Sequence, residues 1–199
     1  MSTMSDAMDH PVILLGGGIG AGKSRVASVF AERGFEVTEA DKVGHDVLRT
    51  NTNAVAAVAD AWPETVDDGV IDRAALARIV FSDPDALATL EAITHPVISQ
   101  TLLERIETSS EPVLIEVPLM KVLAQGPYLR VAVVADAQTR EDRAVARGSQ
   151  RDDVRRRMGH QPSDAEWTAW SDRSIDNSQE WDHTEVRVHA LIDEVLDNG

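Results

Sequence analysis

Near its beginning the chain reads VILLGGGIGAGKSRVASVF, residues 12–30. The apolar run Val12–Leu15 predicts a short buried strand, and the glycines that follow end it abruptly. From Lys23 onward apolar residues recur at helical spacing as far as Gly34, which stands where a helix C-cap belongs. Residues 35–38, Phe-Glu-Val-Thr, alternate as a second strand. Strand, helix and strand in such a short span form a βαβ unit, so we expect a parallel sheet.

Residues 17–24 fit the pattern Gly-x4-Gly-Lys-[Ser/Thr] of a phosphate-binding loop. Glycines allow backbone N–H groups to turn toward phosphate oxygens, and the following helix adds the partial positive charge of its N-terminus. Lys23 is expected to reach the β- and γ-phosphates, and the Ser24 hydroxyl to bind Mg²⁺. The chain's own composition gives a chance match of roughly one in a thousand. We predict that ATP binds here through Lys23 and Ser24 together with Gly18, Ile19, Gly20, Ala21, Gly22 and Arg25.

Three acidic residues stand at or near the ends of predicted strands. Asp41 lies beyond the second strand, where ligands of open parallel sheets gather, and a carboxylate there could act as a general base on an acceptor hydroxyl. The alternative is a helix cap or a surface acid. Strand alternation would turn Glu39 to the same side as Asp41, and one of these two carboxylates could instead hold a metal through water. Glu116 ends the apolar strand Val113–Glu116 and is a possible Mg²⁺ ligand through water, although such strings are common.

Arginines are concentrated in one segment of this acidic chain. Arg140, Arg143 and Arg147 share one face of a predicted helix over residues 137–147, and Arg151, Arg155, Arg156 and Arg157 follow. A solvated basic face is the ordinary explanation of such a run. Guanidinium groups also suit a transferring phosphoryl group, so we expect a lid over about residues 147–162 that closes on ATP and excludes water.

The middle of the chain has a different pattern. Residues 42–110 read as almost entirely helical, with helices near 53–62, 73–81, 85–94 and 96–107, the last opened by Pro96. Strands resume at 113–117 and 131–135, a short strand is expected at 174–176, and an amphipathic helix at 185–196. We therefore predict an α/β fold: a core of residues 11–41 and 111–199, and an all-helical domain of residues 42–110 inserted between strands 2 and 3.

Composition narrows the class of protein. The 199 residues carry a formal net charge of −15 with 4% aromatic residues, which disfavours a nucleic-acid or membrane-surface binder. There is no cysteine, which removes disulfides and thiolate chemistry and fits the cytoplasm. No apolar run is long enough to span a bilayer, and residues 1–10 read as a disordered leader without a signal sequence.

Several longer strings resemble dephospho-coenzyme A kinases, namely residues 14–47, 71–98 and 113–120, the spacing Arg157-x3-Gln161, and Ser-Ile-Asp-Asn-Ser at 174–178. The resemblance implies a P-loop nucleotide core, a helical acceptor domain and a lid. It also implies transfer of the ATP γ-phosphoryl group to the ribose 3′-hydroxyl of dephospho-coenzyme A, the last step of coenzyme A synthesis. We expect a cytoplasmic monomer that needs ATP and Mg²⁺ and binds neither nucleic acid nor membrane.

The resemblance also implies roles for individual residues. Asp41 matches the family's base and Arg143 its charge-stabilising arginine, while Arg147 and Asn177 fall near the adenine end of ATP. The substrate side is expected to include Asp41, Arg73, His95 and Arg157. The chain departs from the family's usual pattern at Gly16, Ala21 and Arg25, where Thr, Ser and Thr are common, and at Met120-Lys121-Val122, which lacks an acid.

Two other functions remain open at this point. One is another P-loop small-molecule kinase, for instance one that acts on a nucleoside monophosphate. The other is a nucleotide-binding regulator without catalytic activity, against which the intact Lys23, Ser24, Asp41 and Arg143 argue.

Overall fold

Five strands form one parallel sheet. In chain order they are β1 (Val12–Gly16), β2 (Glu36–Glu39), β5 (Val113–Glu116), β6 (Leu129–Val134) and β7 (Arg173–Asp176). Their spatial order is β2-β5-β1-β6-β7, and every neighbouring pair is parallel. The predicted parallel α/β sheet is confirmed. Its central strands are apolar on both faces because helices cover both sides.

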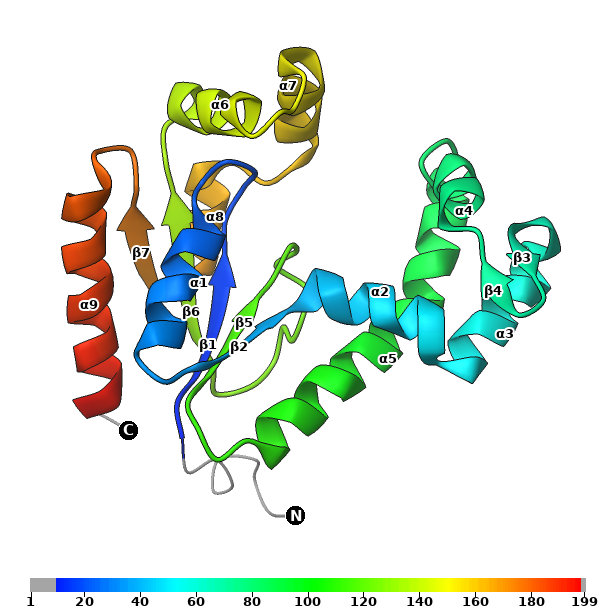
Figure 1. Cartoon of the computed structure of the whole chain (residues 1–199), viewed down its shortest axis with the longest axis horizontal. Coiled ribbons are helices and arrows are strands. Elements are labelled where there is room, and N and C mark those ends of the chain that lie inside the picture. The colour runs from blue at the N-terminus through cyan, green and yellow to red at the C-terminus, as the bar shows by residue number, and fades with distance from the viewer. Residues whose placement is uncertain (1–9, 198–199) are drawn as a thin grey trace. The chain divides into compact units, whose positions relative to one another are not determined.

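The computed structural model describes residues 10–197, so the leader predicted at residues 1–10 lies, apart from His10, outside the described residues. The described chain divides into two compact units. One contains the residues up to Glu39 and those from Ile106 onward, and the other is Ala40–Arg105. Figure 1 shows the five-stranded sheet with its helices and the separate group of α2, α3, α4 and most of α5.

Helices pack on both faces of the sheet in the first unit. α1 (Lys23–Glu32) and α9 (Trp181–Asp197) cover one face, and α8 (Asp164–Trp170) lies on the other (Figure 1). α6 (Ala137–Ala146) and α7 (Arg151–His160) lie beyond the carboxyl ends of the strands and pack against each other. On one face, Phe30 of α1 and Ile192 of α9 share a fully buried core with Ile13 and Leu15 of β1. The opposite face of β1 meets α8, because a Cβ on Gly16 would lie only 2.3 Å from the Trp167 ring.

The second unit is mostly helical. It contains α2 (Ala40–Thr50), α3 (Thr52–Ala61), a 3-10 turn (Pro63–Thr65), the short strands β3 (Val66–Asp67) and β4 (Val70–Ile71), α4 (Arg73–Val80) and most of α5 (Pro84–Thr108). Asn51 caps α3, and Asp72 caps α4 by accepting hydrogen bonds from Ala74 and Ala75 N–H. A core of Val58, Ile71, Leu76, Val80 and Ala86 holds the unit together.

Two predictions for this unit were wrong. The helices expected at 85–94 and 96–107 are one helix, α5, with Pro96 inside it. Proline removes one N–H and disfavours a helical residue before it, but α5 continues as a helix on both sides of Pro96. The insertion is also not all-helical, because β3 and β4 pair across Asp68-Gly69, where both residues have positive φ.

Candidate active site

The phosphate-binding loop lies between β1 and α1, as the motif requires. Gly20 and Gly22 have φ angles of 77° and 102°, which side-chain-bearing residues rarely adopt. Gly22 is the N-cap of α1 and brings no side-chain cap, and the first turn of α1 contains no acidic residue. The first amides of α1 therefore keep their capacity to bind an anion.

Lys23 and Ser24 begin α1 at the mouth of this loop. Lys23 Nζ donates a 2.7 Å hydrogen bond to the carbonyl oxygen of Gly17, so its side chain folds back over the loop. Ser24 Oγ lies 3.4 Å from Oε2 of Glu116, at the end of β5. β5 is the direct neighbour of β1, and Glu116 is paired in register with Leu15. Two of the residues predicted to hold the metal are therefore brought together.

The donor set at this point suits Mg²⁺. A serine hydroxyl and a carboxylate are hard oxygen ligands, and Mg²⁺ in kinases is commonly held by one or two protein oxygens and the substrate phosphates. Glu116 is 9% exposed, so its carboxylate has little access to bulk water. Among residues 10–197 no group of three His, Asp or Glu side chains forms a complete metal cage.

The side chain of Asn177 packs against the phosphate-binding loop. Its side chain is 3% exposed, its Nδ2 donates to Ala21 O at 2.8 Å, and its Oδ1 accepts from Thr184 Oγ1 at 3.0 Å. A Cβ on Gly22 would lie 2.2 Å from the same Nδ2, so the amide fits directly under the loop. Sequence reasoning placed Asn177 near adenine. In the structure its side chain is occupied on both sides by the protein, and it shapes the loop.

The arginine tract separates into paired and unpaired members. Arg140 pairs with Asp164 at 2.5 Å, Arg151 and Arg155 both pair with Glu141, and Arg156 pairs with Asp153. Within residues 10–197, by contrast, Arg143, Arg147 and Arg157 take part in no ion pair. Arg143 Nη1 donates to the carbonyl oxygen of Asn177 at 2.8 Å, whereas Arg147 and Arg157 are exposed.

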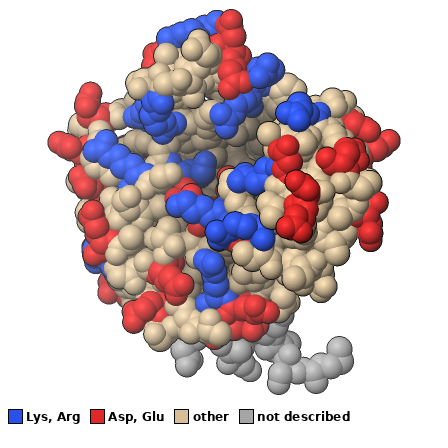
Figure 2. Space-filling model, turned by 45° about the vertical axis from the view of Figure 1, so that its right-hand side comes forward, with Lys and Arg blue, Asp and Glu red and all other residues tan. Residues whose placement is uncertain are grey.

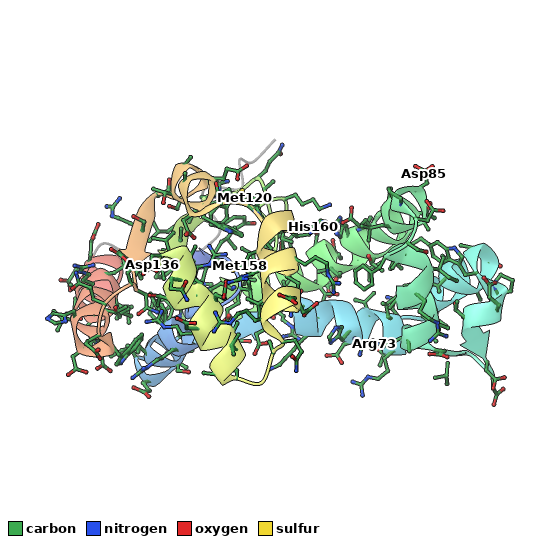
Figure 3. The ribbon with its side chains drawn as sticks, turned by 90° about the horizontal axis from the view of Figure 1, so that it is seen from above. Arg73, Asp85, Met120, Asp136, Met158 and His160 are labelled. Carbon is green, nitrogen blue, oxygen red and sulfur yellow. The ribbon has the colours of Figure 1, made fainter. Side chains whose placement is uncertain are left out.

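Glu141 ties α7 to α6. Hydrogen bonds from Arg155 and Arg151, together with their positive charge, hold the pKa of Glu141 below its ordinary value against the opposing effect of desolvation. Figure 3 shows α6 and α7 side by side, with Asp136 before the first turn of α6 and Met158 and His160 in the last turn of α7. The segment predicted as a lid is thus a helix held by a carboxylate at its base.

Asp41, Arg73 and His95 belong to the second unit. Asp41 does not extend strand β2, which ends at Glu39. It lies in the first turn of α2 and is exposed, so strand alternation does not turn it to the same side as Glu39. The sequence missed this because Ala40 begins the helix without a break. Arg73 begins α4, and His95 lies in the middle of α5 beside Pro96.

Two structural partners of the loop were not predicted as site residues. Arg140 was noted only as a member of the basic helical face, and Gln161 only by its spacing from Arg157. In the structure Arg140 is 3% exposed, and both side chains hydrogen-bond to Ile19 of the loop. The spacing of three residues between Arg140 and Arg143 indicated that both lie on one face of the helix. It could not show that Arg140 is buried, because burial of a single arginine is not visible in a sequence.

Arg25 and Ala21 differ in what they do at the loop. The Arg25 guanidinium lies 4.0 Å from the ring centroid of Trp181, at the beginning of α9, in a cation–π contact. Ala21 is fully buried, and its carbonyl oxygen is the one that Asn177 holds. The missing side-chain hydroxyl at position 21 therefore leaves the backbone contacts of the loop intact.

Basic side chains lie near one another on part of the surface. On the face that Figure 2 draws, several Lys and Arg side chains are close together, although the chain has 34 acidic against 19 basic residues. Such a local group of cations suits a polyanionic ligand. In the described part of the chain, no helix combines the length and apolarity needed to cross a bilayer.

Comparison with known proteins gives one consistent result. A family model described as dephospho-CoA kinase matches residues 11–183. The dephospho-CoA kinase of Frankia casuarinae is 39% identical over 92% of this chain and 82% of its own length. That of Streptomyces avermitilis is 38% identical over 87% of this chain and 88% of its own.

Solved structures share the fold of this chain. The protein TT1252 from Thermus thermophilus superimposes with a TM-score of 0.81 at 30% identity, covering 94% of this chain and 99% of its own. A shikimate kinase from Acinetobacter baumannii, at 14% identity and a TM-score of 0.55 over 98% of both chains, shares the fold.

Proposed function

The chain belongs to the dephospho-CoA kinase family, and we infer that it transfers the γ-phosphoryl group of ATP to the ribose 3′-hydroxyl of dephospho-coenzyme A. The products are coenzyme A and ADP, at the final step of coenzyme A synthesis. The observation that carries this conclusion is the family match over residues 11–183, which extends through the phosphate loop and the lid segment and includes the second unit.

Binding of ATP falls to the loop and the start of α1. The helix amides and Lys23 counter the negative charge of the β- and γ-phosphates, and this charge has to be balanced before an alcohol can approach. Lys23 would leave the Gly17 carbonyl, its partner in this structure, to follow the phosphates. Ser24 and Glu116 would hold Mg²⁺, which supplies further neutralisation of the phosphate oxygens when bound.

Asp41 is our candidate for the group that receives the proton of the 3′-hydroxyl. It follows the carboxyl end of β2 by two residues, and β2 pairs with β5 so that Glu39 lies opposite Glu116. Asp41 is exposed, so an acceptor can reach its carboxylate. A correctly placed general base contributes roughly a hundredfold or more to such a transfer.

Arg143 is the candidate for stabilising charge on the transferring group. Its single hydrogen bond to the Asn177 carbonyl orients the guanidinium and leaves other N–H donors for a ligand. Arg147 and Arg157, which carry no ion pair within residues 10–197, are the candidates for lid contacts with the nucleotide. A lid that closes only with the acceptor in place would protect ATP from water.

The second unit would bind the acceptor. Arg73 and His95 would contact dephospho-coenzyme A from the second unit, as the resemblance implies. We further propose a monomer that acts in the cytoplasm, where ATP and a soluble acceptor are both present. Gel filtration tests the monomer, since a dimer would elute at about twice the 21.6 kDa of the chain.

An ADP-release assay over a panel of acceptors tests the function. We expect release to depend on dephospho-coenzyme A and to stay near background with adenosine monophosphate, with shikimate and without acceptor. Release that is highest with adenosine monophosphate would favour a nucleoside monophosphate kinase. Nucleotide binding without release on any acceptor would favour a regulator.

A further inference from the structure

The peptide of Ile19, at the tip of the phosphate loop, is held from both sides. Its N–H donates to Oε1 of Gln161 at 2.7 Å, and its carbonyl oxygen accepts from Nε of Arg140 at 3.0 Å. Arg140 is oriented in turn by Asp164, whose Oδ1 lies 2.5 Å from Nη1. All four residues belong to the first unit, although more than a hundred residues of sequence separate Ile19 from the others.

Within the loop, Ala21 N–H donates to Gly18 O at 3.2 Å and closes the turn, but this bond makes no contact with the Ile19 peptide itself. Ile19 is flanked by Gly18 and Gly20, and glycine populates positive and negative φ about equally, so the peptides between them can rotate at little cost. Gly20 also packs against the helix backbone, because a Cβ there would lie 2.1 Å from the carbonyl oxygen of Arg140. The orientation of the tip therefore depends on contacts from outside the loop.

Arg140 differs from the other arginines of its segment. It is 3% exposed, and its guanidinium is occupied by the Ile19 carbonyl, by Asp164 and by close packing on Gly18. A side chain so placed cannot swing out to a transferring phosphoryl group without breaking a partly buried ion pair. Arg140 therefore binds the loop backbone and does not contact substrate.

We propose that Arg140 and Gln161 are positioning residues that clamp the Ile19 peptide and hold the loop in its nucleotide-binding shape. Gln161 directly follows α7, so the same contact joins the end of the lid segment to the loop. The clamp acts on nucleotide affinity and leaves the transfer step to other residues. The inference rests on the proposed function only in that the ligand of the loop is an adenine nucleotide.

Removal of either side of the clamp tests the proposal. Gln161→Met and Arg140→Met each remove one hydrogen bond to Ile19 while keeping most of the side-chain volume. We expect each to raise the Kd for ADP about tenfold, as measured by calorimetry without acceptor, with kcat at saturating ATP changed by less than about threefold. Arg140→Lys keeps a cation beside Asp164 and serves if Arg140→Met does not fold. Arg173→Met, which removes an exposed pair with Glu194, is the matched control and should leave the Kd unchanged.

The double variant gives the sharper result. Once one of the two hydrogen bonds is removed, the Ile19 peptide can rotate, and the remaining bond no longer fixes its orientation. The Kd for ADP of the double variant should therefore rise clearly less than the product of the two single-variant increases. Fully multiplicative losses would show two unrelated structural contacts and overturn the clamp. So would an unchanged Kd in both single variants, or a loss of kcat with the Kd intact. ADP titration needs no acceptor, so these outcomes are separate from a failure of the proposed kinase activity.

Discussion

Replacement of Asn177 by aspartate should destabilise the fold in a pH-dependent way. Asn177→Asp preserves the shape of the side chain but exchanges the Nδ2 donor for an oxygen, which then faces the carbonyl oxygen of Ala21 at the 2.8 Å that the hydrogen bond now spans. Thr184 can still donate to the other oxygen. The variant thus loses one bond and leaves a buried acceptor unpaired.

The magnitude follows from these contacts. A lost hydrogen bond contributes about 1 kcal/mol, and an unsatisfied buried acceptor costs about 2 kcal/mol more. For a protein of this size each kcal/mol lowers Tm by about 3 °C. We therefore expect Asn177→Asp to unfold roughly 10 °C below the wild type at pH 8.

The pH dependence has a definite sign. Burial beside a carbonyl oxygen raises the pKa of the new carboxyl group above its ordinary value. Because the folded-state pKa is the higher one, the protonated group can donate to Ala21 at low pH, and this stabilisation is lost as the pH rises through the folded pKa. The Tm deficit should therefore be small near pH 4 and grow toward pH 8.

Thermal unfolding followed by circular dichroism at several pH values measures this effect. Asn53→Asp is the matched control, since the same chemical change on an exposed residue in the first turn of α3 should alter stability by less than about 0.5 kcal/mol. A deficit in Asn177→Asp that is equal at pH 4 and pH 8, or no larger than that of the control, would refute the role given to the Asn177 amide.

Three further predictions concern catalysis, the lid and α5. Lys23→Ala and Asp41→Asn should each lower turnover by roughly two orders of magnitude or more in the ADP-release assay with unchanged circular dichroism, and near-normal turnover of Asp41→Asn would exclude it as the base. Glu141→Gln should speed amide hydrogen exchange in α7 at pH 7. Because the pKa of Glu141 is lowered in the folded state, protection of α7 in the wild type should fall as the pH drops below about 4. Equal exchange in both proteins would contradict the role of Glu141 in holding α7 to α6. Pro96→Ala should raise the free energy of unfolding by about 1–3 kcal/mol in denaturant titration because it restores a helix N–H, and a loss of stability would mean that the proline fits a bend that α5 requires.

The sequence predicted those parts of the site that depend on local chemistry. The loop over residues 17–24, the helix that begins at Lys23 and the strand that ends at Glu116 follow from apolar runs, glycines and spacing, and all are present in the structure. Pro96 does not begin a new helix as predicted, because tertiary packing overrides a single unfavourable residue in a long helix.

The tertiary structure alone decided which polar side chains serve the loop. Ser24 meets Glu116 because β5 adds beside β1, and Asn177 reaches Ala21 because β7 ends at the same edge of the sheet. It also distinguished Arg140, which is buried against Ile19, from Arg143, which has the same residue type on the same helix. The identity and spacing of residues along the chain determine the phosphate-binding motif and the local turn that it forms. Burial and partner choice depend on strand order, which brings together residues that lie more than ninety positions apart.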